Sequence, residues 1–360
     1  MIARSMRETA VVLSGGLFTT PSAKTAHGLV RGPSRFEVLA LVDAAHPGAD
    51  AGELLDGRRR AIPVHASLRD CLASGLKPQW VVVGVATSGG VLPPELRASV
   101  LEALELGIGV VNGLHELVGD DAQFAAAAQR SGARIVDVRR PKARRELHFW
   151  SGAIAQVRAP RIAVIGTDCA LGKRTTAQLL VAACAKRGVR AEMIYTGQTG
   201  WLQGGRFGFV LDSTPNDFVS GELEHAIVSC ERELAPDVMF LEGQSALRNP
   251  SGPCGAELLL SGGARAVVLQ HAPRREFFDD QEHLHNRLPS IASELELLAF
   301  YGARALALTL NHEHLPEAER EAARRQVERE SGLRALYPLL EPLDELVELV
   351  LQHVAAERAR

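Results

Sequence analysis

The residues with the clearest chemical potential form a glycine-rich loop between positions 166 and 176. Gly166 follows a short β-branched run at 161–165, and Gly172 and Lys173 precede a helical pattern that stops at Gly188. A strand, a glycine loop, a Gly-Lys pair and a helix, in this order, are the context of a phosphate-binding loop. Glycines let backbone N–H groups turn toward a phosphate, the helix amino terminus adds its dipole, and the lysine adds a full charge. The residues that we expect to contact the phosphates of a cofactor are Gly166, Thr167, Asp168, Gly172, Lys173, Arg174, Thr175 and Thr176.

Two features separate this loop from the most common form of phosphate loop. Gly166 and Gly172 enclose five residues rather than four, a spacing that resembles the loop of dethiobiotin synthetase and its relatives, where ATP activates a carboxylate. The residue after Lys173 is Arg174 instead of Ser or Thr. The missing hydroxyl normally binds Mg²⁺, which a guanidinium cannot do, although Thr175 could replace it after a local shift. Phosphate binding is therefore expected, whereas phosphoryl transfer does not follow.

Polar clusters stand at the ends of four further predicted strands in the second half of the chain. They begin at Tyr195, Glu242, His271 and Asn311. We expect them to converge on the phosphate loop, because an open α/β sheet binds its ligand at the carboxyl ends of its strands. The alternatives are polar turns and, for His271, a structural histidine. Asp217 lies between the first two clusters and is either a helix cap or an active-site base, so the candidate bases are His271, Glu242 and Asp217.

Six motifs of this chain resemble those of one bacterial family of two-domain P-loop proteins, long described as a domain of unknown function. In order they are GTDCALGKRTTA, YTGQTGW, DFVSGELE, EGQSAL, LQHAPRRE and TLNHE. With them the chain resembles the DgcN-type D-glutamate N-acetyltransferase family. The segment 23–31 is similar to that family's first domain, so the resemblance covers most of the chain. Arg274 departs from the pattern, because a small residue is expected between the proline and the second arginine of LQHAPRRE.

The resemblance implies an enzyme that moves acetyl from acetyl-CoA to the amine of D-glutamate or a similar acidic amino acid. CoA carries a pyrophosphate and a ribose 3′-phosphate, so the loop could hold it without hydrolysis and without a metal. Arg275, Lys24 or Arg31 would hold the substrate carboxylates. A polar loop with Lys24, Thr25 and His27 would close the site between two domains. The residues that we expect on the acceptor side are Lys24, Thr25, His27, Arg31, Gln198, Thr199, Gln244, Arg275, Asn311 and Glu313.

Two other functions fit the same residues. The first is a kinase or ligase that uses ATP and Mg²⁺ to activate a carboxylate, as dethiobiotin synthetase does; Thr175 and Glu242 would then bind the metal and Lys173 the nucleotide. The second is a regulator that binds a nucleotide or CoA without turnover.

Strands and helices alternate along the chain, which predicts parallel sheets covered by helices on both faces. We expect an α/β protein with an N-terminal Rossmann-like domain over 1–145. A P-loop NTPase-like domain, a doubly wound parallel sheet with C-terminal helices, should cover 146–360. An apolar stripe with helical spacing from Leu343 to Val354 predicts core packing or, alternatively, a subunit contact. The predicted strands are 9–13, 37–42, 80–85, 108–111, 134–138, 161–165, 191–195, 237–241, 266–270 and 305–310, and the predicted helices between the early strands are 94–106 and 115–130.

Composition narrows the class of partner. The 360 residues include 40 basic and 43 acidic side chains, a net charge of −3 that argues against nucleic-acid or membrane binding through bulk charge. No apolar run approaches the ~18–20 residues of a membrane span. The five cysteines have no CxxC spacing, which excludes a zinc ribbon and is typical of a reducing cytosol. Composition therefore favours a cytoplasmic protein, and the resemblance implies a small acidic amino acid as its partner; we also expect a homo-oligomer.

Overall fold

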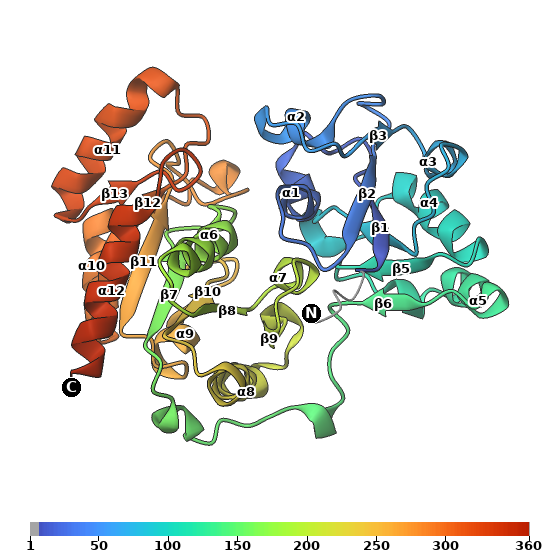
Figure 1. The fold of residues 1–360 in the computed structure, drawn as a ribbon. Coiled ribbons are helices and arrows are strands. Elements are labelled where there is room, and N and C mark those ends of the chain that lie inside the picture. The colour runs from blue at the N-terminus through green and yellow to red at the C-terminus, as the bar shows by residue number, and fades with distance from the viewer. Residues whose placement is uncertain (1–6, 360) are drawn as a thin grey trace. The chain divides into compact units, whose positions relative to one another are not determined.

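The computed structural model describes residues 7–359, which form two compact units (Figure 1). The first unit contains the chain up to Lys142 together with Gln198–Gly205, and the second contains Ala143–Gly197 and the chain from Arg206 onward. Both are α/β units built on parallel sheets, which confirms the predicted fold class. No helix among the described residues is long and apolar enough to span a bilayer.

The first unit is a six-stranded sheet in the order β3-β2-β1-β4-β5-β6, the strand order of a Rossmann-like fold. Its neighbouring strands all pair in parallel. The strands are β1 (Thr9–Leu13), β2 (Glu37–Val42), β3 (Val64–His65), β4 (Trp80–Val83), β5 (Gly109–Asn112) and β6 (Ile135–Asp137). The helices are α1 (Lys24–Arg31), α2 (Ala51–Asp56), α3 (Leu68–Ala73), α4 (Pro94–Glu105), α5 (Ala122–Ser131) and α7 (Gln198–Leu202), with short 3-10 helices at Pro21–Ala23, Ser88–Gly90 and Val118–Asp120.

Helix α7 belongs to the first unit although its neighbours in the chain, β8 and β9, belong to the second. Leu202 has no exposed surface and packs in a core cluster with residues of α1, β1 and β4. The Gln203 side-chain amide donates to the carbonyl of Gly28 over 2.8 Å, and the Arg35 Nε donates to the carbonyl of Trp201 over 3.0 Å. No sequence pattern predicted this exchange of a segment.

The second unit is a seven-stranded sheet in the order β13-β12-β11-β7-β10-β8-β9, again with parallel pairs throughout. The strands are β7 (Arg161–Gly166), β8 (Ala191–Tyr195), β9 (Phe207–Gly208), β10 (Val238–Glu242), β11 (Ala266–His271), β12 (Arg304–Leu310) and β13 (Ala335–Leu336). The helices are α6 (Lys173–Lys186), α8 (Asn216–Leu234), α9 (Ala256–Leu260), α10 (Ile291–Phe300), α11 (Glu317–Ser331) and α12 (Asp344–Arg358), with 3-10 helices at Arg144–Glu146, Ala153–Gln156, Leu211–Ser213 and Glu282–Leu284.

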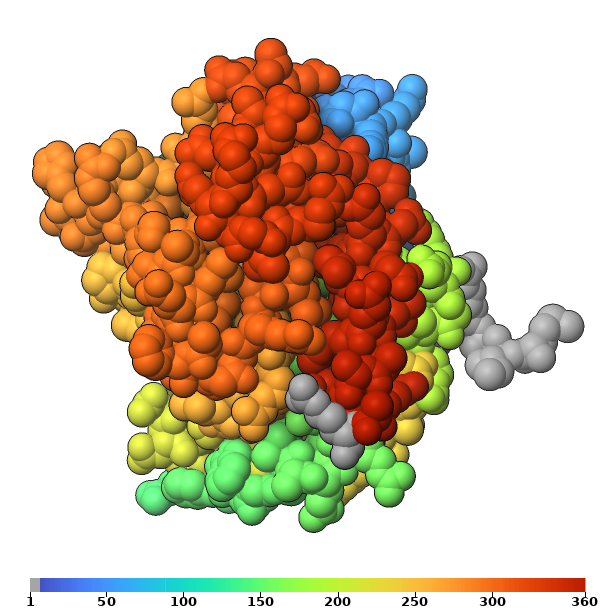
Figure 2. Space-filling model, turned by 90° about the vertical axis from the view of Figure 1, so that its left-hand side faces the viewer, coloured from blue at the N-terminus to red at the C-terminus, as the bar shows by residue number. Residues whose placement is uncertain are grey.

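Helices cover both faces of this second sheet. Ala163 and Ile165 of β7 share a core cluster with residues of α8, α9, α10 and α11, whereas α6 and α12 pack together on the opposite face. Figure 2 shows the side of the unit formed by the last helices, coloured orange to red. In α12, Leu346, Val347 and Val350 are fully buried. The apolar stripe at the end of the chain is therefore core, as the first of its two interpretations predicted.

Three details of the sequence prediction were wrong. The strands β3, β9 and β13 were missed because two residues are too few to form a pattern. The helix predicted over 115–130 begins only at Ala122, where the Asp121 carboxylate accepts the backbone N–H groups of Gln123 and Phe124 as a cap. The polar loop expected around Lys24 is the first turn of α1, a helix whose opposite side is buried.

Candidate functional site at the phosphate loop

The loop between β7 and α6 has the backbone geometry that its two glycines require. A Cβ on Gly166 would lie only 3.1 Å from the carbonyl oxygen of Gln270 and 3.3 Å from the Leu171 side chain, so a larger residue would fit only if these neighbours shifted. Gly172 caps the amino end of α6 with a φ of 98°, a conformation that L side chains rarely adopt. The first turn of α6 therefore begins at Lys173, with its dipole at the loop.

Lys173 lies inside this loop with its ammonium held by backbone carbonyls. Its Nζ donates to the carbonyl oxygens of Asp168 over 2.6 Å and Ser245 over 2.7 Å, and only 6% of the residue is exposed. Burial lowers the pKa of Lys173 to about 8, against the smaller opposing effects of Cys169 and Asp168. Ser245 has a φ of 29°, unusual for a residue other than glycine. Such strain is typical of functional sites.

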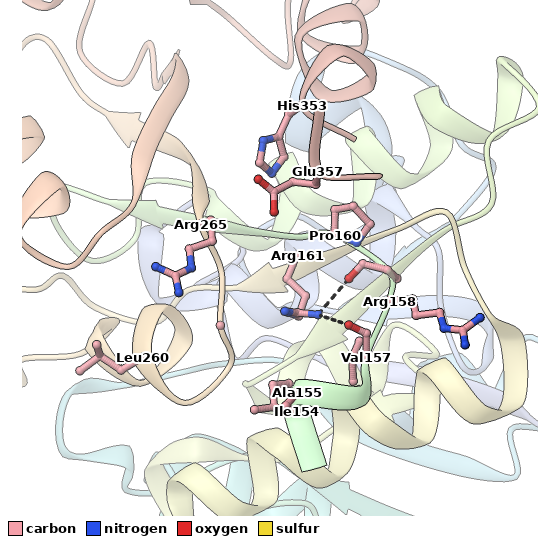
Figure 3. Close-up of a pocket in the computed structure, with 12 residues that line it drawn as sticks. Ile154, Ala155, Val157, Arg158, Pro160, Arg161, Leu260, Arg265, His353 and Glu357 are labelled. Atoms are coloured by element: carbon pink, nitrogen blue, oxygen red, sulfur yellow. Dashed lines mark hydrogen bonds between the residues drawn. The ribbon is translucent and has the colours of Figure 1, made fainter. Parts of the chain in front are cut away.

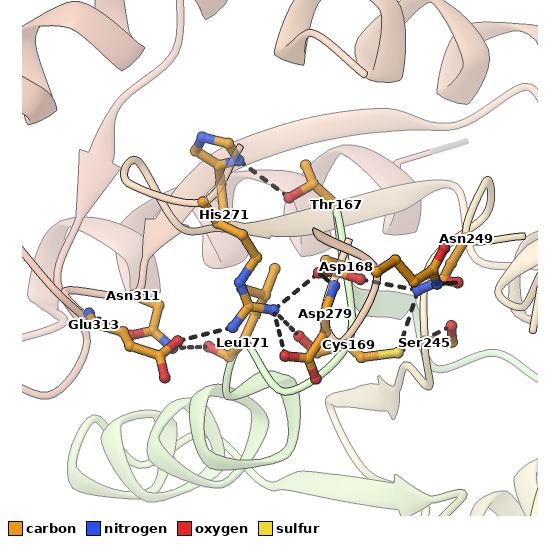
Figure 4. A network of polar contacts seen from close by, with 12 residues as sticks. Thr167, Asp168, Cys169, Leu171, Ser245, Asn249, His271, Asp279, Asn311 and Glu313 are labelled. Carbon is orange, nitrogen blue, oxygen red and sulfur yellow. Dashed lines mark hydrogen bonds and ion pairs between the residues drawn. The ribbon is translucent and has the colours of Figure 1, made fainter. Parts of the chain in front are cut away.

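Asp168 connects the loop to two other segments of the second unit (Figure 4). Its carboxylate has no exposed surface and accepts hydrogen bonds from the Asn249 side chain at 2.9 Å, from Arg275 at 2.9 Å and from the backbone N–H of Asp279 at 2.7 Å. Asn249 follows β10, and Arg275 and Asp279 follow β11. A buried carboxylate with three donors, one of them a cation, is compensated, so Asp168 fixes the shape of the loop.

Arg275 is occupied by this network. Its guanidinium donates to the Asp168 carboxylate, to the carbonyl of Cys169 at 2.8 Å and to the Glu313 carboxylate at 2.8 Å. Burial alone would lower the pKa of Arg275, but Asp168, Asp279 and Glu313 together raise it. Arg275 and Glu313, both predicted to bind the acceptor, therefore bind each other here. In this structure Arg275 holds the loop through Asp168 and Cys169, and Glu313 holds Arg275.

Glu242 is buried at the carboxyl end of β10, close to the positive charges that follow Gly172. One carboxylate oxygen accepts the backbone N–H of Thr196 at 2.9 Å. Burial raises the pKa of Glu242, while the charges of Arg174 and, more weakly, Lys173 act in the opposite direction. The Glu242 carboxylate therefore lies within the electrostatic reach of two cations at the first turn of α6.

His271 is the last residue of β11, and Thr176 lies in the first turn of α6. The Nδ1 atom of His271 is 3.1 Å from the Thr167 hydroxyl, and burial lowers the pKa of His271 to about 4. His271 is consequently a neutral imidazole at pH 7. The Thr176 hydroxyl donates to the Gln270 side chain at 2.7 Å, in the buried interior. The Thr176 hydroxyl is thus bonded to a buried amide, and the predicted phosphate contact of Thr176 stays a prediction.

Other predicted residues of the second unit have distinct surroundings. Asn311 donates to the carbonyl of Leu171 at 3.2 Å, so it braces the phosphate loop from the end of β12. The Gln244 amide donates to the Thr196 hydroxyl at 2.9 Å. Asp217 is exposed in the first turn of α8, where a carboxylate interacts favourably with the helix dipole but makes no cap hydrogen bond. Arg274, the departure from the family pattern, pairs with Glu319 of α11.

The remaining predicted acceptor-side residues lie in the first unit. Thr25 is buried on α1, and its hydroxyl is 3.2 Å from the hydroxyl of Thr199 on α7. His27 packs edge-on against Phe18 and its Nε2 contacts the Phe18 carbonyl. The predicted acceptor-side residues in the first unit are Lys24, Thr25, His27, Arg31, Gln198 and Thr199. A site shared by the two units stays a prediction.

Sequence reasoning missed Asn249 and Asp279, which hold the loop, and placed Ser245 in the cluster that begins at Glu242 without a role of its own. Ser245 accepts the Lys173 ammonium, Asn249 donates to Asp168, and the backbone of Asp279 donates to the same carboxylate. Their only sequence signal is their position a few residues beyond β10 and β11. Single polar residues after a strand are too common for that signal to select them.

The described donors near the loop do not include a cluster of metal-binding side chains. Among the described residues, no group of three or more His, Cys, Asp or Glu side chains is arranged to hold a metal ion. Of the hydroxyls after Lys173, that of Thr176 is bonded to Gln270 and that of Thr175 is half-buried. Arg174 adds a positive charge close to Glu242, the carboxylate a metal would need. These residues fit an anion better than an Mg²⁺ ion.

Comparisons with known proteins agree with this architecture. The P-loop domain model of the DUF1611 family, a domain of unknown function, matches residues 148–347, and its Rossmann-like N-terminal domain model matches residues 44–141. A D-glutamate N-acetyltransferase from Tritonibacter scottomollicae is 31% identical over 282 residues, which cover 76% of this chain and 80% of that protein. A D-glutamate N-acetyltransferase from a Pseudoalteromonas species is 31% identical over 234 residues, 63% of this chain and 66% of that protein. The crystal structure of a DUF1611 family protein from Anabaena variabilis has a TM-score of 0.87 at 27% identity and covers 96% of this chain and 99% of its own.

Fold and loop together define a two-domain α/β protein with a Rossmann-like unit and a P-loop unit. The chain belongs to the DUF1611 family. This confirms the resemblance inferred from the six motifs.

Proposed function

We propose that this protein is an N-acetyltransferase that moves acetyl from acetyl-CoA to the amine of an acidic amino acid similar to D-glutamate. The names of the two relatives at 31% identity support the transfer and the acceptor class. The donor is inferred from the chemistry of the loop. The phosphates of CoA need an anion site, and a buried Lys173 at a helix amino terminus supplies one.

The observation that carries the proposal is the electrostatic setting of Glu242. Arg174 and Lys173 both stabilise its charged form. Two fixed cations at this point neutralise phosphate charge without a metal. The Glu242 carboxylate then does not have to bind a metal ion. A loop of this kind binds phosphates as a handle instead of breaking a phosphate bond.

In this reaction the acceptor's neutral amine attacks the thioester carbonyl of acetyl-CoA. The C–S bond breaks as the C–N bond forms, and the proton lost by the nitrogen reaches the departing CoA thiolate through a base. The base must be deprotonated at working pH and should have a pKa near it. Glu242 meets this requirement better than His271, since burial raises the pKa of Glu242 and lowers that of His271 to about 4.

Asp217 is the weakest of the three candidate bases. It is exposed on α8 and has no recorded contact with a loop residue among the described side chains. The pH profile separates the other two. If Glu242 is the base, kcat/KM is high above its raised pKa and is lost as pH falls through that value. A base with the pKa of His271 would lose activity only near pH 4.

The decisive experiment incubates the protein with acetyl-CoA and with D- and L-glutamate or aspartate in the presence of EDTA, and follows free thiol. Thiol release with the D-amino acid that survives EDTA is expected. Lys173→Ala should abolish it, and Lys186→Ala, at the far end of the same helix, should not. A requirement for Mg·ATP with release of ADP would refute the proposal in favour of a kinase or ligase in which Thr175 and Glu242 bind the metal.

A further inference from the structure

Three neighbouring strands of the second unit have an arginine at or just before their first residue. The amino ends of these strands lie at the end of the sheet opposite to the phosphate loop. Arg161 is the first residue of β7, Arg265 immediately precedes β11, and Arg304 is the first residue of β12. These strands are adjacent in the order β12-β11-β7. The backbone N–H of Arg304 donates to the carbonyl of Arg265, so the two residues are direct neighbours. Like charges brought together in this way repel unless something neutralises them.

A pocket of about 420 Å³ lies beside this row (Figure 3). Arg161 and Arg265 line it, together with Arg158 and with His353 and Glu357, which lie one turn apart on α12. A second hollow of about 500 Å³ shares Arg265, His353 and Glu357 with the first and extends to Arg304. The volume is that of a small-molecule site, for which about 300–1,000 Å³ is usual.

Arg161 is the central cation of the pocket and is incompletely bonded. Its Nη1 donates to the carbonyls of Val157 at 3.2 Å and Ala159 at 3.0 Å, while the buried Nε has no hydrogen-bond partner. No carboxylate lies within ion-pair distance of it among the described residues. Burial lowers the pKa of Arg161, Arg265 lowers it further, and Glu231 and Glu357 act against this from a distance. A buried donor without an acceptor is costly, so the site lacks an anionic partner.

Two other arginines of this unit that also have a buried nitrogen without a hydrogen-bond partner are paired with carboxylates. Arg248 pairs with Glu294 at 2.8 Å, and Arg324 pairs with Glu341 at 2.7 Å. In the pocket, by contrast, one acidic side chain lines a wall that also carries three arginines. The contrast indicates that the row of arginines is not an ordinary structural ion-pair network.

We propose that this pocket binds a small oxyanion with two or more negative charges, a phosphate compound or a polycarboxylate, with Arg161 and Arg265 as its main ligands. The guanidinium fork of Arg161 suits such an anion, because it can donate two parallel hydrogen bonds to planar or tetrahedral oxygens. The site is separate from the phosphate loop. β7 runs from Arg161 to Gly166, and at ~3.3 Å per residue the two ends lie roughly 17 Å apart.

The test uses the full-length chain with Lys173→Ala, which removes the loop's ammonium, and titrates it by calorimetry with inorganic pyrophosphate and with citrate. One anion-binding event should remain. Adding Arg161→Met should weaken it by about ten- to a hundred-fold, the loss expected for charge-assisted hydrogen bonds. Arg206→Met, which removes an exposed arginine paired with Glu233, is the matched control and should change nothing. The tighter of the two probes identifies the phosphate or the carboxylate class.

Arg265→Met provides a second variant, because Arg265 is exposed and its side chain makes no hydrogen bond within residues 7–359. It should weaken the same anion even if Arg161→Met does not fold. When Arg161→Met or Arg265→Met is made in a protein that keeps Lys173, desulfo-CoA should still bind the phosphate loop with unchanged affinity. This control separates failure of the pocket from failure of the loop. Absence of binding in the Lys173→Ala protein, or equal affinity in the Arg206, Arg161 and Arg265 variants, would overturn the proposal.

Discussion

The pKa of Lys173 makes a quantitative prediction about the affinity of the phosphate loop. In the free protein, burial holds this pKa at about 8. A bound phosphate gives the ammonium an opposite charge and should return the pKa toward its ordinary value of 10.5. Binding then takes up a proton wherever the free lysine is neutral. Affinity should be highest below pH 8 and fall as pH rises between the free and bound pKa values.

The size of the effect follows from proton linkage. Between about pH 7 and about pH 9.5, the dissociation constant should rise roughly 30-fold, or about 2 kcal/mol. The ligand for the assay is desulfo-CoA, which carries the phosphates of CoA but no thiol. The last ionisation of its phosphates has a pKa of about 6, so the ligand's charge changes little over this range. Calorimetry in two buffers of different ionisation enthalpy would also detect the proton taken up.

Two variants show whether the lysine is responsible. Lys173→Met should bind weakly and with no pH dependence in this range, whereas Lys186→Met on the same helix should behave as the parent does. Cys169→Ser, used as the background, removes a second ionisable group that interacts with Lys173. A parent protein whose affinity is flat from about pH 7 to about pH 9.5 would refute the reasoning, because a buried ammonium that binds phosphate must titrate in this window.

Further predictions concern the rest of the site and the exchanged helix. Glu242→Gln should lower kcat strongly and leave the affinity for desulfo-CoA within a factor of a few, because the change removes a base and keeps the shape; Glu242→Gln with unchanged turnover would exclude that role. Arg275→Leu should destabilise the second unit by about 3–5 kcal/mol by leaving the Asp168 carboxylate unpaired, and denaturant unfolding should show Asp168→Asn in the same background restoring part of the loss. Leu202→Ala should cost about 2–5 kcal/mol and appear in the unfolding of the first unit, to whose core Leu202 belongs. Lys24→Ala should raise KM for the acidic amino acid and leave KM for acetyl-CoA unchanged; equal changes in both would contradict a carboxylate-binding role.

The sequence was most informative where local chemistry decides the structure. The strand before Gly166, the positive φ of Gly172 and the lysine at the helix start follow from short-range requirements, and the structure has all three. Alternation of apolar runs was enough to predict two parallel sheets. Strand ends were located to within a few residues, which is why polar residues such as Glu242 and His271 were predicted near one edge of the second sheet.

What sequence could not supply was the partner of each polar residue. Arg275 looks like a substrate ligand by type and position, but a buried carboxylate at position 168 competes for it. Thr176 follows the lysine as a phosphate ligand would, yet its hydroxyl turns inward to Gln270. Such choices depend on which long-range neighbour lies nearest, and no local pattern encodes them. The packing of Leu202 in the core of the first unit also depends on long-range neighbours, and no local pattern predicted it.

The charged residues of the loop have two different roles: some hold the shape of the loop, and Lys173 is proposed to bind the phosphate. Arg275 and the side chain of Asn249 satisfy Asp168, so this part of the network is complete without a ligand. Lys173, in contrast, donates to two neutral carbonyls, and burial lowers its pKa to about 8. A phosphate therefore needs to displace only those two bonds, while the framework that shapes the loop stays intact. Because little has to be reorganised, most of the attraction between the ammonium and the phosphate remains available as affinity.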